Sequence, residues 1–207
     1  IDACIGKMLD VIEDRPDADN TVVCFFTDHG EMLGDHHAWQ KECYFEAAAH
    51  IPFLLSWPAQ LEADRQVDDL VCLTDLFGIA TGAAGDAETR DGIDVLGMLH
   101  GAVSPRSFYV GMYEMPGTDL FKCMVRSREW KYIFMANGGR EQLFDLVNDP
   151  NERTNRAAER LAVVEELHGH AVATLTGTSA ECAIEGSRLR AFPFRARPLR
   201  RVYQMGD

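Results

Sequence analysis

The sequence has no long apolar run and no excess of basic residues, and each absence argues against a class of partner. No stretch approaches the roughly 20 apolar residues that a membrane-spanning helix needs. The net charge of -13 argues against a general nucleic-acid binder, which usually carries a basic surface. We therefore expect no membrane and no nucleic-acid partner. A small anion remains a suitable ligand, because a local site can be positive on an acidic body.

The sequence also lacks any C-x-x-C pair or compact disulfide framework, because its six cysteines are scattered. Cys24 and Cys72 each lie in an apolar run, so we expect both to be buried free thiols. Free thiols favour a reducing compartment and hence the cytoplasm. A periplasmic or secreted location stays open, because a signal peptide cannot be assessed in a chain that starts at Ile1.

The chain opens inside a helical pattern. Apolar residues at positions 1, 5, 8, 9 and 12 repeat with the helical period, and no N-cap residue precedes them. We therefore expect the chain to be the C-terminal portion of a longer protein. Its 207 residues, of which 46% are hydrophobic, suffice for a globular core in one large or two small domains.

Residues 1–100 alternate between helix and strand patterns, which predicts an α/β domain. Strands are predicted over 21–27 and 51–57. The first of them is an unbroken apolar run, so we expect it to be buried. A helix is predicted over 73–81, with Gly82 as its C-cap.

Residues 101–207 show a different pattern, in which short strands come first and one long helix follows. This order predicts a small α+β subdomain with an antiparallel sheet and one packing helix. Strands are expected over 107–113, 121–127, 130–135 and 142–146, and the helix over about 154–175.

An arginine-rich tail spans residues 186–201 and contains no acidic residue. We expect it to lie across the acidic body of the protein or across a neighbouring subunit, which in the second case would join a homo-oligomer. A contact with a substrate or another polyanion is the alternative. The arginines of the tail are Arg188, Arg190, Arg195, Arg197, Arg200 and Arg201.

The candidate site follows the first predicted strand, in the segment T-D-H-G-E-M-L-G-D-H over residues 27–36. Asp28 and His29 at a strand exit can hold a divalent cation, at the sheet edge where open α/β folds bind ligands. Lys41 could neutralise an anion bound beside that cation. The pattern is typical of half of a metal-dependent hydrolase. The alternatives are a structural turn capped by Asp28 and a solvated Lys41.

This segment, with Lys41 and the later Ile51-Pro52-Phe53, resembles the second signature region of the sulfatase family. That family belongs to the alkaline-phosphatase-like superfamily, which includes phosphonate monoester hydrolases. Further family landmarks follow in the right order. They are L-T-D-L-F over 73–77, D-G-I-D-V-L over 91–96, V-R-S-R-E-W-K-Y-I over 125–133, and a closing block over 142–155 that contains Asp149-Pro150, Glu152 and Asn155.

The resemblance implies a fold and a site. Residues 1–100 would be the C-terminal part of an alkaline-phosphatase-like mixed-sheet α/β domain, and 101–207 its small α+β subdomain. Asp28 and His29 would bind the metal, and Lys41 would contact sulfate or phosphate oxygens. Apart from the resemblance, His36 and His37 lie beside Asp35 in the same loop, and we expect His36 to lie near the site and orient the ligands, the alternative being that both are simply exposed. Carboxylates suit Ca²⁺ or Mg²⁺, whereas an imidazole ligand also suits Mn²⁺ or Zn²⁺.

The family's nucleophile is missing from this sequence. Sulfatases of the family use a formylglycine made from the Cys or Ser of a C/S-x-P-x-R motif, and none of the six cysteines starts that motif. The family's first metal-binding Asp pair would also lie upstream. The resemblance therefore implies the C-terminal portion of a metal-dependent sulfatase of small-molecule sulfate esters, inactive as an isolated chain. A phosphonate or phosphate ester hydrolase and a non-catalytic remnant domain are the alternatives.

Overall fold

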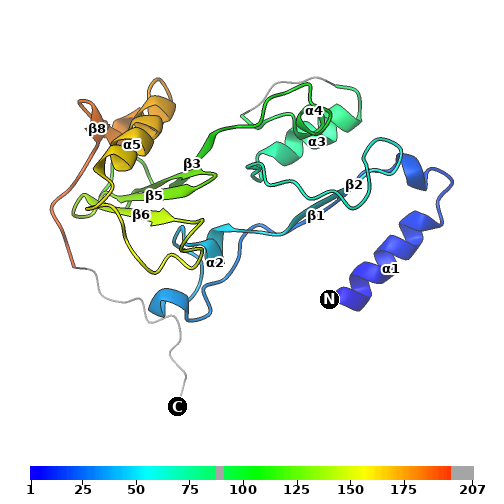
Figure 1. Cartoon of the computed structure of the whole chain (residues 1–207), viewed down its shortest axis with the longest axis horizontal. Helices are drawn as coiled ribbons and strands as arrows, with labels where there is room; N and C mark the ends of the chain where they lie inside the picture. The colour runs from blue at the N-terminus through cyan, green and yellow to red at the C-terminus, as the bar shows by residue number, and fades with distance from the viewer. Residues whose placement is uncertain (87–90, 197–207) are drawn as a thin grey trace, which may run out of the picture. The chain divides into compact units, whose positions relative to one another are not determined.

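The computed structural model describes residues 1–86 and 91–196. The chain divides into two compact units, Ile1–Ser107 and Phe108–Asp207 (Figure 1). Both units combine helices with antiparallel strand pairs. No helix in the described ranges is long and apolar enough to span a bilayer.

The first unit contains two strands and four α-helices in its described part. The opening helix and both predicted strands are present, and the sequence patterns missed the short helices α2 and α4. The elements are α1 (Asp2–Glu13), the 3-10 turn η1 (Ala18–Asn20), β1 (Val23–Phe26), the 3-10 turn η2 (Asp35–His37), α2 (Glu46–Ala49), β2 (Phe53–Ser56), α3 (Asp75–Ala83) and α4 (Val95–Leu99).

Strands β1 and β2 form an antiparallel pair that is packed on one face only. Phe53 and Leu55 of β2 pack against the cluster formed by Ile79, Val95 and Met98 of α3 and α4. On the other face, Leu54 lies opposite Phe25, and these side chains are 61% and 41% exposed. The expectation of a buried strand over 21–27 is therefore wrong for this chain, because neither a further strand nor a second packing layer covers β1 among the described residues.

Helix α3 is organised by the buried carboxylate of Asp75. Its two oxygens accept hydrogen bonds from the N–H of Cys72 at 2.7 Å and of Ile93 at 2.8 Å, and the guanidinium of Arg106 pairs with it. The helix continues through Gly82 and ends at the C-cap Ala84, so the predicted C-cap at Gly82 is wrong. Gly82 keeps a helical conformation because the chain turns left-handed only later, at Gly85.

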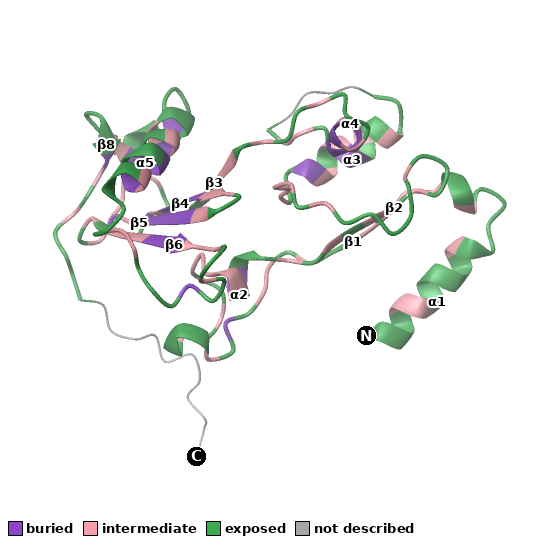
Figure 2. Cartoon of the chain, viewed as in Figure 1, coloured by how far each residue is buried: buried purple, intermediate pink, exposed green. Residues whose placement is uncertain are grey.

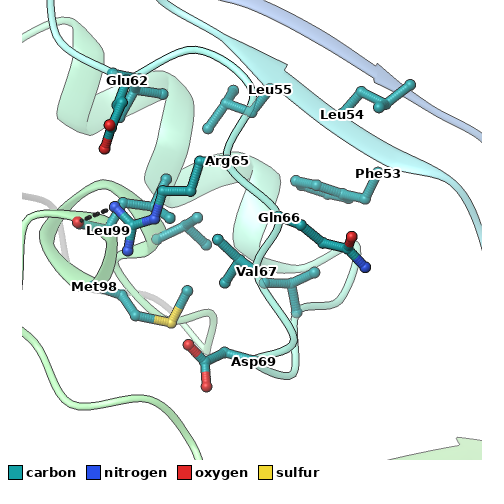
Figure 3. Close-up of a pocket in the computed structure, with 13 residues that line it drawn as sticks. Phe53, Leu54, Leu55, Glu62, Arg65, Gln66, Val67, Asp69, Met98 and Leu99 are labelled. Carbon is teal, nitrogen blue, oxygen red and sulfur yellow. Dashed lines mark hydrogen bonds between the residues drawn. The ribbon is translucent and has the colours of Figure 1, made fainter.

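An apolar cavity of about 370 Å³ lies between β2 and α4 in the first unit (Figure 3). Phe53, Leu55 and Met98 line it, and Arg65 crosses it to donate a hydrogen bond to the Leu99 carbonyl at 2.9 Å. None of the residues that the sequence predicted for the site lines this cavity. It is therefore distinct from the predicted site.

The second unit is a four-stranded antiparallel sheet, in the order β3-β4-β5-β6, with helix α5 packed on it (Figure 1). All four predicted strands and the predicted packing helix are confirmed. The elements are β3 (Phe108–Tyr113), β4 (Lys122–Ser127), β5 (Trp130–Met135), β6 (Arg140–Asp145), α5 (Leu161–Leu175), the 3-10 turn η3 (Glu181–Ala183), β7 (Ile184–Glu185) and β8 (Arg188–Leu189).

The core of the second unit lies between α5 and the central strands. Figure 2 shows the buried residues concentrated on β4 and β5, in contrast to the exposed α1 of the first unit. The helix contributes side chains spaced three and four residues apart, which is the pattern of a single packed face. They are Val164, Leu167, Ala171 and Leu175, and they meet Cys123, Val125, Tyr132 and Leu143 of the sheet.

Helix α5 begins at Leu161, later than the predicted start near 154. The intervening residues form a hydrogen-bonded loop instead. The Asn155 amide accepts from the N–H groups of Leu143 and Ala157 and donates to the Glu141 carbonyl. Asn155 thus ties the loop to β6, a long-range contact that helical periodicity does not reveal.

The cysteines differ in part from the expectation that Cys24 and Cys72 are buried free thiols. All six cysteines are free. Cys24 and Cys72 are only partly buried, however, because their strand and loop are covered on one side, and Cys123 in β4 is the buried one.

The described part of the tail lies on its own unit. Arg188 pairs with Glu165 of α5 at 3.0 Å, and the Asn137 side chain exchanges two hydrogen bonds with the backbone of Arg195. Arg197, Arg200 and Arg201 lie outside the described residues, so the subunit contact stays a prediction.

A buried ion pair joins two of the family landmarks in the second unit. Lys131 Nζ on β5 lies 2.8 Å from Glu152 Oε1, and both side chains are almost fully buried. Glu152 adopts a left-handed φ of 54°, which a non-glycine residue rarely does. The pair explains why a lysine and a glutamate can sit inside this core, since a buried charge is tolerated when it is paired.

We expect Lys131→Met to lower the free energy of unfolding by about 3–5 kcal/mol, because it removes the lysine that pairs with the buried Glu152 charge. Arg156→Met is the matched control, since it breaks an exposed ion pair with Glu159 and should cost about 1 kcal/mol or less. Urea unfolding measures both. Equal losses of unfolding free energy in the two variants would show that the buried pair stabilises the fold no more than the exposed pair does.

Buried His168 provides a second polar contact in this unit. Its Nε2 accepts a hydrogen bond from the Leu189 N–H at 3.1 Å, which attaches β8 to α5. Burial, helped by the charge of Arg188, lowers the pKa of His168 below its ordinary value, and the charges of Glu141 and Glu165 oppose this shift. The neutral imidazole is the form that can accept this bond.

We expect the second unit to lose stability as the pH falls below about 6.5. The unfolded chain takes up a proton on His168 there, whereas the folded chain does not until its lower pKa is reached. Above that window both states are neutral at His168 and the contribution is constant. Unfolding midpoints measured against pH should show a shallower acid decline in His168→Gln. An equally steep acid decline in the variant would contradict this role of His168.

Candidate metal and anion site

The site begins where β1 ends, and a close backbone contact fixes its position. The Gly30 N–H donates to the Ala48 carbonyl at 2.9 Å, and the Glu31 N–H donates to the Ala47 carbonyl at 3.0 Å. A Cβ atom on Gly30 would lie 2.1 Å from the Ala47 oxygen, so only glycine allows this approach. The segment after β1 is therefore held against α2.

Asp28, His29 and Lys41, which the sequence analysis selected for the site, lie next to one another. The Nε2 atom of His29 lies 3.3 Å from Asp28 Oδ2, and Lys41 Nζ contacts the same Nε2 atom. The Asp28 side chain is 76% exposed and the His29 side chain 35% exposed, so both are accessible to a ligand. A carboxylate, an imidazole and an ammonium group thus share one exposed position.

The imidazole of His29 is oriented for coordination through Nε2. Its Nδ1 atom lies 2.8 Å from the Gly30 carbonyl oxygen, which accepts a hydrogen bond only if Nδ1 carries the proton. Nε2 then presents its lone pair toward Asp28 and Lys41. Metal-binding histidines usually show this arrangement, in which the second ring nitrogen donates to a backbone carbonyl or carboxylate.

Asp28 is held in its charged form. Slight burial raises the pKa of Asp28, but the charge that His29 carries when its ring is protonated, together with hydrogen bonds from the His29 N–H and the Thr27 hydroxyl, outweighs it and lowers the pKa. An ionised carboxylate is the form that coordinates a cation.

His36 belongs to the loop that follows, and its ring contact is with Phe45. The two rings stack at 3.9 Å with planes 7° apart. This contact anchors the loop over 32–40 to the residue before α2. The structure therefore gives His36 a position in the site loop, and its predicted role as a ligand-orienting group stays a prediction.

The described residues do not form a complete metal site. Within 1–86 and 91–196, no group of three or more His, Cys, Asp or Glu side chains is arranged to hold a metal ion. Asp28 and His29 fit as two ligands of a hard or borderline cation. Sequence reasoning missed the contribution of Gly30 and α2, for which the only signal was the glycine that follows His29.

Comparison with known proteins identifies the family. The family model described as Sulfatase matches residues 1–85. Arylsulfatase K of Mus musculus is 30% identical over 170 residues, covering 76% of this chain and 31% of the relative. Choline-sulfatase of Rhizobium meliloti (strain 1021) is 30% identical over 174 residues, covering 80% and 33%. The chain belongs to the sulfatase family. It spans about a third of the length of these curated relatives.

Solved sulfatase structures share the fold. The putative sulfatase yidJ from Bacteroides fragilis matches with a TM-score of 0.75 at 22% identity, covering 86% of this chain and 40% of that one. The phosphonate monoester hydrolase of Agrobacterium radiobacter matches with a TM-score of 0.71 at 25% identity, covering 84% and 38%. The predicted alkaline-phosphatase-like mixed α/β fold is confirmed.

We expect Gly30→Ala to lower the free energy of unfolding by about 1–3 kcal/mol, because its methyl group would collide with the Ala47 carbonyl. Gly6→Ala is the matched control, since Gly6 lies inside α1 with nothing near its Cβ position. That substitution should leave stability unchanged or raise it by about 0.5–1 kcal/mol. Thermal unfolding of both variants distinguishes a close contact at Gly30 from a general effect of alanine.

Proposed function

We propose that this chain is the C-terminal portion of a metal-dependent sulfuric ester hydrolase that acts on small-molecule sulfate esters. In this proposal Asp28 and His29 bind the metal, and Lys41 contacts the sulfate oxygens. The nucleophile, expected to be a formylglycine, and the remaining metal ligands come from another part of the longer protein. The isolated chain would then be inactive.

The observation that carries the proposal is the meeting of Asp28, His29 and Lys41 at one exposed position. Lys41 is thirteen residues beyond Asp28 in the sequence, yet its ammonium group contacts the imidazole of His29 in the folded chain. An anion bound there would meet a fixed positive charge, which stabilises charge that develops on the oxygens of an ester during hydrolysis. A bound divalent cation supplies Lewis-acid polarisation of those oxygens.

The donor set suits such a cation. The His29 lone pair and the ionised Asp28 carboxylate are one nitrogen and one oxygen donor, a combination that accommodates Ca²⁺, Mg²⁺ or Mn²⁺ when further carboxylates join it. The Gly30 carbonyl fixes the imidazole, so the metal-facing nitrogen needs no rearrangement before binding. Little of the binding free energy is then spent on ordering the ligand.

A phosphonate or phosphate ester hydrolase is the second candidate function. The likeness to the phosphonate monoester hydrolase of Agrobacterium radiobacter favours it, since that enzyme shares the fold at 25% identity. Asp28, His29 and Lys41 would serve both reactions, because sulfate and phosphonate esters both place negative charge on non-bridging oxygens.

In the longer protein, we expect Asp28→Asn to reduce the bound divalent metal and Lys41→Met to leave it in place. Both substitutions should lower kcat/KM for a sulfate ester by about 100-fold or more, because each removes a fixed charge beside the reacting oxygens. Elemental analysis and steady-state assays measure the two effects. Lys7→Met, at an exposed lysine of α1, is the control.

The same assays separate the candidates. Faster hydrolysis of a phosphonate monoester than of the matching sulfate ester would favour the second function. Wild-type protein that binds no metal and hydrolyses neither ester would identify the chain as part of a non-catalytic domain.

A further inference from the structure

The loop that connects the two halves of the site is unusually strained and tightly bonded. Five residues between 33 and 40 adopt a positive φ, and four of them are not glycine: Leu33, His36, His37 and Gln40. Such conformations persist only where surrounding contacts determine them, and they gather at ligand-binding sites. The loop is therefore built to hold particular side chains in fixed positions.

Backbone hydrogen bonds close this loop on itself. The Met32 N–H donates to the Gln40 carbonyl at 3.0 Å, and the Gly34 N–H donates to the Ala38 carbonyl at 2.9 Å. Met32 is buried and His36 is stacked on Phe45, which anchors the loop from inside. The loop thus has a packed interior although it lies at the surface.

The backbone N–H and the backbone carbonyl of Gln40 are both hydrogen-bonded. Its N–H donates to the carboxylate of Glu31, and its carbonyl accepts from Met32. The peptide groups that flank Gln40 link it to Trp39 and to Lys41, so the main chain that carries these two residues is fixed. The Cα atoms of Trp39 and Lys41 are at most about 7 Å apart, since consecutive Cα atoms are about 3.8 Å apart.

Trp39 is exposed although the loop around it is ordered. It is 71% exposed, whereas Trp57 donates to Asn20 and Trp130 packs against the core of the second unit. A Cβ atom on Gly34 would lie 3.8 Å from Cζ2 of Trp39, so the indole rests beside the Gly34 backbone. An exposed, anchored indole offers a flat apolar surface with a low entropic cost of binding.

We propose that Trp39 is a specificity-determining residue that stacks on the ring of a ring-bearing sulfate ester, either aryl or sugar. This inference rests on the proposed function. Lys41 holds the sulfate end, and Trp39, two residues earlier on the same fixed backbone, contacts the ring to which the sulfate is attached. The short span between the two residues suits a ring bonded to the ester oxygen directly or through one carbon. A small alkyl sulfate offers no flat face to the indole.

The test compares two esters in the longer protein, an aryl sulfate and a small alkyl sulfate. We expect Trp39→Ala to raise KM for the aryl sulfate by about 3- to 10-fold, the range of one aromatic stacking contact. Its kcat, and both constants for the alkyl sulfate, should stay near the wild-type values. Trp39→Phe keeps a flat ring and should recover most of the aryl-sulfate KM.

The alkyl ester controls for folding, because a damaged loop would impair both reactions. Equal loss on the two esters, or an unchanged KM for the aryl sulfate, would overturn the role of Trp39. The proposed function fails separately, if the wild-type protein hydrolyses neither ester. A wild-type enzyme that is active but indifferent to Trp39→Ala would overturn this inference alone.

Discussion

The contact of the Gly30 backbone with Ala47 and Ala48 is the constraint on which the candidate site is built. It brings a short helix against the end of β1 at a distance that excludes any side chain at position 30. The Gly30 carbonyl then orients His29, and Lys41 is placed against that imidazole. One close backbone approach thus sets the position of a carboxylate, an imidazole and an ammonium group that would otherwise be independent surface side chains.

Several residues of the family landmarks stabilise the core. Lys131 and Glu152 look like functional charges in the sequence, yet they form a buried ion pair inside the second unit. Asp75 and Asn155 likewise satisfy backbone groups, at the start of α3 and beside β6. A buried polar group must be paired to be tolerated, so such positions accept few substitutions for reasons of stability alone.

The site loop shows how the fold supports conformations that are unfavourable by themselves. Each left-handed non-glycine residue costs on the order of 1–3 kcal/mol. Hydrogen bonds between the arms of the loop and the stacking of His36 on Phe45 oppose that cost. The result is an ordered surface that exposes Trp39 and Lys41 while burying Met32.

The sequence by itself determined the order of the longer helices and of strands β1 to β6, and it selected the candidate site residues. Strong apolar periods marked β1 to β6 and α5, and the resemblance of residues 27–41 to a sulfatase signature selected Asp28, His29 and Lys41. These features are local, or are carried by short contiguous motifs.

Only the tertiary structure decided how distant residues meet. It placed Lys41 on His29, paired Lys131 with Glu152, and showed that β1 is covered on one face only. It also showed that α5 begins at Leu161 rather than near 154, because the Asn155 side chain is hydrogen-bonded to β6. Periodicity reports which side of an element is apolar, but it does not report which partner lies against that side. That choice depends on packing between segments far apart in the chain.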